Sequence, residues 1–206
     1  VGYEMYCHLL EESVLELKNE KPPEKPSETS VEIGVGGLIP RTFIPSEARR
    51  LEAYRRLATA ATQEQLRTLG KDLRDAYGEP PKAAQRVFDL AEVRIALAGL
   101  GVRTCTIRER DVIFLAPDPI PVAAALERHA KGAAAEATIR VLPPKTDGQL
   151  AEVYFRPPEQ YLAPETLLAV LRRRLGIAAE PTPGSVTVQP PAPGRSGRPR
   201  SGSRAS

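Results

Sequence analysis

Two carboxylates, Asp72 and Asp75, stand three residues apart in the stretch DLRDAYGEPP, which continues with an aromatic residue, a glycine and two prolines. Paired carboxylates can act as general acid and base if burial or a like charge raises the pKa of one of them. Lys71 and Arg74 are close neighbours, and we expect both carboxylates to face water. These residues alone leave three hypotheses open: a solvated helix face, a protein-docking face, or the acid-base pair of a small hydrolase.

Motifs for nucleotide binding and nucleophilic catalysis are not found in the sequence. Gly70-Lys71 cannot close a phosphate-binding loop, because Gln65 stands where its first glycine belongs. The glycine-rich stretch GVGGLIP lacks the GxGxxG spacing and runs into a proline. His8 and His129 belong to no metal or triad motif and are expected to be half-exposed helix residues. We expect no ATPase and no catalytic, cofactor-binding or metal-binding residue in this chain.

Composition indicates a soluble globular protein of 206 residues, 41% hydrophobic and 27% charged. No apolar run approaches the ~20 residues of a membrane span, and no signal peptide pattern opens the chain. We therefore expect a cytoplasmic protein without membrane partners. Cys7 and Cys105 are far apart and are expected to be small core residues. The first residue, Val1, suggests a piece of a longer polypeptide.

The positive charge lies in the last segment of the chain. Removing the four arginines after residue 180 from the 29 basic residues leaves 25, against 26 acids. This tail is rich in Pro, Gly and Ser and is predicted to be disordered; alternatively, its arginines bind nucleic acid in a salt-dependent way. The arginine runs at 49–50, 55–56 and 172–174 are interpreted as solvated faces or helix-end charges.

The two carboxylates are predicted to lie on one helix. Thr62 and Gln65 have the spacing of a capping box, and Gly78 stands where a C-cap glycine belongs, before two prolines. The apolar residues of this helix recur at helical spacing and predict its buried stripe: Leu66, Leu69, Leu73 and Tyr77.

The remaining pattern predicts an α+β fold, with a helical N-terminal half packed against a small β-rich second half. Further helices are predicted at 2–20, 47–60, 82–100, 122–130 and 164–175. Strands are predicted at 31–35, 102–108, 112–117, 137–142 and 151–157, and the proline-bounded segment 38–45 is expected to be extended. By residue range, we expect a helix (1–20), a flexible linker (21–30), the folded domain (31–180) and a disordered tail (181–206).

Four stretches together resemble, in order and spacing, the C-terminal domain of the bacterial transcription-repair coupling factor family. They are VGYEMYCHLLEESV, LIPRTFIPSEARRLEAYRRLATA, DLRDAYGEPP and VFDLAEVRIALAGLGV. The resemblance covers roughly residues 1–180 and is dense up to about residue 115. It implies that the 1–20 helix continues from a translocase segment of a longer parent protein.

The resemblance implies a function for the parent and a different one for this domain. The parent would be an ATP-dependent DNA translocase that displaces stalled RNA polymerase and recruits nucleotide excision repair, with ATP and Mg²⁺ bound in lobes outside this chain. The C-terminal domain would be a non-catalytic, autoinhibitory protein-binding domain. It would pack on an excinuclease-B-like module and mask the surface that binds the excinuclease A protein.

The family's acidic helix ends in a pattern like E-L-x-D-R-F-G, which corresponds here to residues 72–78. The resemblance therefore implies protein-binding roles for Asp72, Asp75 and Ala76 and favours the docking hypothesis. Two positions depart from the family pattern: Ala76 replaces the usual arginine, and Asp72 is shorter than the usual glutamate. An ion pair made by that arginine would be missing here.

Overall fold

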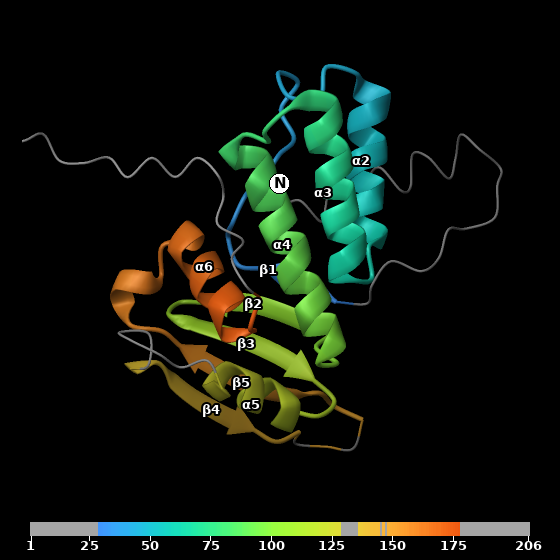
Figure 1. The fold of residues 1–206 in the computed structure, drawn as a ribbon. Helices are drawn as coiled ribbons and strands as arrows, with labels where there is room; N and C mark the ends of the chain where they lie inside the picture. The colour runs from blue at the N-terminus through green and yellow to red at the C-terminus, as the bar shows by residue number, and fades with distance from the viewer. Residues whose placement is uncertain (1–28, 129–135, 145, 147, 178–206) are drawn as a thin grey trace, which may run out of the picture.

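The chain forms a group of three helices beside a five-stranded sheet in the computed structural model (Figure 1). The structure describes residues 29–128, 136–144, 146 and 148–177. The predicted α+β class is confirmed, and four of the five described strands follow the helical group in the chain.

The helix that carries the two carboxylates begins and ends where the sequence places its caps. The helical group contains α2 (Glu47–Thr59), α3 (Gln63–Tyr77) and α4 (Lys82–Gly99), and the second half adds α5 (Ile120–Arg128), the 3-10 helix η2 (Glu159–Tyr161) and α6 (Pro164–Arg174). Both arms of the predicted capping box of α3 are present, since Thr62 accepts from the Gln65 backbone and the Gln65 side chain accepts from the Thr62 backbone. Gly78 follows α3 with φ of 82°, a conformation that favours glycine.

The sheet joins a strand that precedes the helical group to four that follow it. Its strands are β1 (Ser30–Glu32), β2 (Thr104–Arg108), β3 (Asp111–Ala116), β4 (Thr138–Leu142) and β5 (Ala151–Arg156), in the spatial order β1-β2-β3-β5-β4. Among these described strands, the β1–β2 pair is parallel and the other three pairs are antiparallel. Thr29, the residue before β1, adds a contact beside the β1–β2 pair by donating its hydroxyl to the Val102 carbonyl at 2.7 Å. Thr29 and Ser30, which the predicted 21–30 linker included, are thus attached to the sheet.

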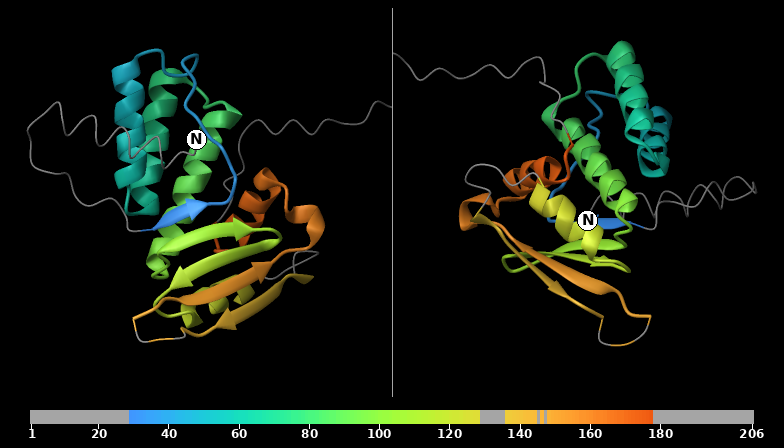
Figure 2. Two further views of the ribbon diagram at one scale, coloured as in Figure 1. Left: turned by 180° about the vertical axis from the view of Figure 1, so that it is seen from behind. Right: turned by 60° about the horizontal axis from the view of Figure 1, so that its bottom comes forward.

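One face of the sheet carries the apolar core, and α4, α5 and α6 lie against it (Figure 2). Alternate residues of the two central strands point into this core and are fully buried, among them Val112, Phe114, Val153 and Phe155. No helix of the described residues covers the opposite face. Cys105 is buried in the core of the sheet, as expected for a small apolar residue.

Helix α4 connects the two halves because it is apolar on two sides. Leu90, Val93 and Leu97 pack into the core of the sheet, whereas Val87 and Ile95 pack against α2 and α3. The wide apolar arc seen in the sequence therefore serves two cores. This arrangement places α3 on the far side of α4 from the sheet (Figure 1).

The segment 38–45 differs from the extended chain that was predicted. The backbone amides of Phe43 and Ile44 both donate to the Pro40 carbonyl, which closes a turn. The turn brings both side chains into the helical core, where Ile44 is fully buried. Burial of these two residues outweighs the extended preference that proline confers on its neighbours.

The interpretation of the arginine runs as solvated charge is wrong for Arg50 and Arg174, which are 8% and 2% exposed. Arg50 donates to the carbonyls of Ile44 and Pro45, and Arg174 donates to the Leu126 carbonyl at 2.7 Å. The Arg174 guanidinium also lies 5.4 Å from the centre of the Phe155 ring. Carbonyl groups in a loop and at a helix end accept hydrogen bonds from these arginines, which makes burial of the two side chains possible.

Several predictions concern residues outside the described ranges: the helix at 2–20, Cys7, His8, His129 and the tail at 181–206. Across the residues that the structure does describe, no helix combines the length and apolar character needed to cross a membrane.

Candidate functional site on helix α3

The three residues of the predicted docking face lie exposed on α3. Asp72, Asp75 and Ala76 all face away from the helical core, into which Leu66 and Leu69 of the same helix are buried. The positions of the apolar residues therefore decide, through helical spacing, that the acids point outward.

The two carboxylates differ in their surroundings. Asp72 forms an ion pair with Arg56 of α2 at 2.8 Å, and both side chains are about half exposed, at 49% and 43%. Asp75 has no ion pair with any residue that the structure describes. The expected neighbour Arg74 instead pairs with Glu79 at 3.3 Å. Sequence spacing carries no signal for the Arg56 contact, because its partner lies 16 residues away on another helix.

This geometry does not support the hydrolase hypothesis. A carboxyl group that donates a proton near neutral pH needs burial or a like-charged neighbour to raise its pKa. Asp72 is half exposed beside a cation, and neither Asp72 nor Asp75 lines the groove described below. A charged, accessible face of this kind suits a protein-protein contact better than acid-base chemistry.

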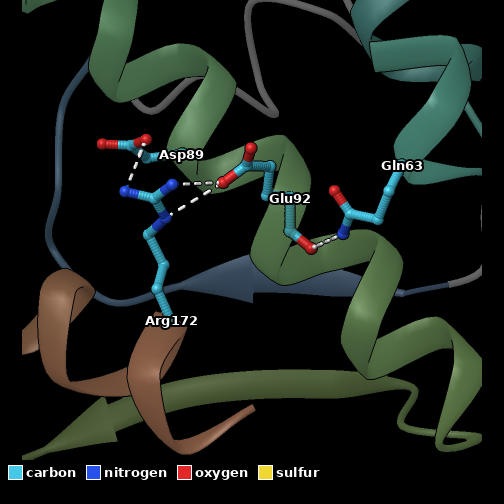
Figure 3. A network of polar contacts seen from close by, with 4 residues as sticks. All are labelled: Gln63, Asp89, Glu92 and Arg172. Carbon is cyan, nitrogen blue, oxygen red and sulfur yellow. Dashed lines mark hydrogen bonds and ion pairs between the residues drawn. The ribbon is translucent and has the colours of Figure 1, made fainter. Parts of the chain in front are cut away.

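A groove of about 550 Å³ opens on the other side of α3, between this helix, α4 and the end of α6. Three of its ionic residues form one network (Figure 3). Arg172 of α6 contacts Asp89 at 2.9 Å and donates to Glu92 through Nε at 3.0 Å and through a second nitrogen. Gln63 of α3 donates its amide to the Glu92 carbonyl at 2.9 Å. The network thus ties the sheet-bound helix α6 to the helical group.

Burial and the Arg172 charge act in opposite directions on the two acids of this network. Burial raises the pKa of both Asp89 and Glu92, and the nearby Arg172 charge opposes this shift. Among the described residues no group of three or more His, Cys, Asp or Glu side chains could hold a metal ion. Because Arg172 already pairs with both acids, we interpret the network as structural. The sequence carries no local signal for this network, since Arg172 lies 80 residues from Glu92.

Comparison with known proteins shows which family and which fold the chain resembles. The TRCF domain model matches residues 33–122, from the residue after β1 into α5. The transcription-repair-coupling factor of Mycobacterium tuberculosis is 28% identical over 203 residues, covering 89% of this chain and 16% of the relative. The factor of Escherichia coli is 34% identical over 107 residues, which are 50% of this chain and 9% of the relative.

A solved structure shows the same fold. The crystal structure of the C-terminal domain of transcription-repair coupling factor superposes with a TM-score of 0.51 at 17% identity, covering 75% of this chain and 96% of that domain. The chain therefore spans less than a fifth of the length of the two curated relatives but nearly the whole of this solved domain. We conclude that residues 33–122 match the TRCF domain, and that the chain is similar to transcription-repair coupling factors and has the fold of their C-terminal domain.

Proposed function

We propose that this chain is the regulatory, autoinhibitory domain of a transcription-repair coupling factor. In this proposal its α3 face, made of Asp72, Asp75 and Ala76, binds an excinuclease-B-like module of the same parent protein and masks the surface for the excinuclease A protein. The observation that carries the proposal is the outward position of both carboxylates on a helix that is capped at each end and packed on one side only.

A contact made by this face is well suited to autoinhibition that must be reversible. Ion pairs at exposed positions contribute about 1 kcal/mol or less each, so a few of them can be broken by binding energy gained elsewhere. Asp72 is already paired with Arg56. A basic residue of the module must therefore share the Asp72 carboxylate with Arg56 or displace Arg56 from it. Asp75 is the carboxylate that can accept a new partner without such competition.

Under this proposal the chain hydrolyses no ATP, and the translocase activity, with its ATP and Mg²⁺, belongs to parts of the parent outside this chain. RNA polymerase, DNA and the excinuclease A protein would be reached only through the parent. The competing hypothesis of nucleic-acid binding rests on the arginines of the 181–206 tail, which lie outside the described residues.

Calorimetric titration of this chain with the parent's excinuclease-B-like module tests the proposal. We expect binding at low salt that Asp75→Lys weakens strongly and Asp72→Lys weakens less, because Arg56 already neutralises part of the Asp72 charge. Glu127→Lys is the matched control, since Glu127 is an exposed helix acid in the sheet half. Unchanged affinity in the Asp72→Lys/Asp75→Lys double variant would remove α3 as the docking face.

A further inference from the structure

The described chain ends inside the groove between α3, α4 and α6. Leu175, Gly176 and Ile177, the last described residues, all line it. Helix α6 ends in a Schellman motif: Gly176 has φ of +71°, its amide donates to the Arg173 carbonyl, and the Ile177 amide donates to the Arg172 carbonyl. This motif reverses the chain direction, and Ile177 is partly buried against the core. Residue 178 therefore starts from the wall of the groove.

The groove offers apolar surface and a cation that has no ion pair among the described residues. Leu66, Leu73 and Phe88 contribute apolar lining from α3 and α4. Two of the arginines in the groove are already paired, because Arg172 contacts its two acids on α4 and Arg74 contacts Glu79.

The remaining cation is Arg67 of α3. It is close enough to Glu92 to favour the ionised form of that acid, but it forms no ion pair within 4 Å with any described residue. Within the part of the chain that the structure describes, the groove thus lacks one anionic partner.

The sequence that follows Ile177 supplies a matching segment. Ala178 and Ala179 are small and apolar, Glu180 is the one acid among residues 178–206, and Pro181 follows it. Three extended residues span about 10 Å, and Glu180 is the third residue after Ile177. Ile177 and Arg67 line the same groove, so a Glu180 side chain laid along it would share that groove with the Arg67 guanidinium.

We propose that residues 178–181 occupy this groove, with the two alanines on its apolar lining and Glu180 paired with Arg67. The segment then belongs to the folded domain and helps to join α6 to α3 and α4. The arginine-rich remainder of the tail begins beyond the groove. This inference concerns the side of α3 away from Asp72 and Asp75 and does not depend on the proposed docking function.

Methyl-labelled alanine NMR on the full 206-residue chain tests the placement directly. We expect nuclear Overhauser contacts from the Ala178 or Ala179 methyl group to the Phe88 ring or to the methyl groups of Leu66 or Leu73. Absence of all these contacts in the unmodified chain would overturn the proposal, and the groove would then be open to the 1–28 segment or to another protein.

Charge variants of the full chain test the predicted ion pair. Glu180→Arg and Arg67→Glu should each weaken the alanine contacts at least severalfold, whereas the double variant, which exchanges the two charges, should restore them. Arg49→Glu is the control, because Arg49 is exposed on α2 and does not line the groove. Contacts that survive both single reversals, or that the charge exchange fails to restore, would refute the pairing of Glu180 with Arg67.

Discussion

Replacing Arg172 by methionine should destabilise the domain, because this arginine compensates two partly buried acids. Methionine keeps most of the apolar stem of the side chain and removes the guanidinium group. Asp89 and Glu92 would then lose the contacts that Arg172 makes from α6 (Figure 3). The change removes this ionic connection between α6 and α4 but leaves the apolar contacts between them.

The expected loss follows from the exposure of the three side chains. Removing one partner of a fully buried ion pair costs about 3–5 kcal/mol, whereas a fully exposed pair is worth about 1 kcal/mol or less. Arg172, Asp89 and Glu92 are 20%, 29% and 24% exposed, which places the network between these limits. We expect a loss of about 1–3 kcal/mol, or a fall in Tm of about 3–8 °C for a domain of this size.

The loss should depend on pH, and its sign follows from linkage. Burial raises the folded-state pKa of Asp89 and Glu92, and removing Arg172 raises both pKa values further. Groups with a raised folded-state pKa contribute stability at pH values below their unfolded pKa and lose it as the pH rises through the folded pKa. The Arg172→Met variant therefore loses more stability than the unmodified chain as the pH rises to 7. Its deficit should shrink as the pH falls toward about 4, where unfolded Asp and Glu become protonated.

Urea unfolding followed by circular dichroism, repeated at a series of pH values from about 4 up to 7, measures this deficit. Arg173→Met is the matched control, since Arg173 is the exposed neighbour on the same helix and takes no part in the network. Equal stability of the Arg172→Met and Arg173→Met variants at neutral pH, or a deficit that does not change with pH, would refute the compensation argument.

Two further predictions concern a close backbone contact and an exposed ion pair. Gly37→Ala should lower stability by about 1–3 kcal/mol in thermal unfolding, because the new Cβ would lie 2.8 Å from a Val87 methyl group and 3.0 Å from the Val87 backbone nitrogen. Gly36→Ala, where nothing lies within 4 Å, should change stability far less, and equal effects would disprove the steric explanation. Arg156→Ala should raise the pKa of Asp111 in an NMR titration, because the Arg156 hydrogen bonds hold that pKa below its usual range. The stability that this pair contributes is present above the unfolded pKa of Asp111 and is lost as the pH falls through the folded pKa, so an unchanged titration would show that the pair does not persist in solution.

Local sequence determined the helices and the outward direction of the acidic pair. Thr62, Gln65 and Gly78 place both ends of α3, and the spacing of its leucines places Asp72 and Asp75 on the solvent side. These features depend on interactions within one or two helical turns, which can be read from residue types at i, i+3 and i+4. The ordered motifs of the family could be recognised for the same reason, because they lie within single elements or at their ends.

Tertiary structure alone decided which charges are compensated and how the strands of the sheet are paired. The pairing of β1 with β2 spans the whole helical group, and the contacts from Arg172 to Glu92 and from Arg174 to Leu126 span 80 and 48 residues. A run of arginines at a helix end looks the same in sequence whether its side chains face water or a buried carbonyl. The physical reason is that burial and partner choice depend on the packing of elements distant in the chain, whereas helix formation and helix capping depend on near neighbours.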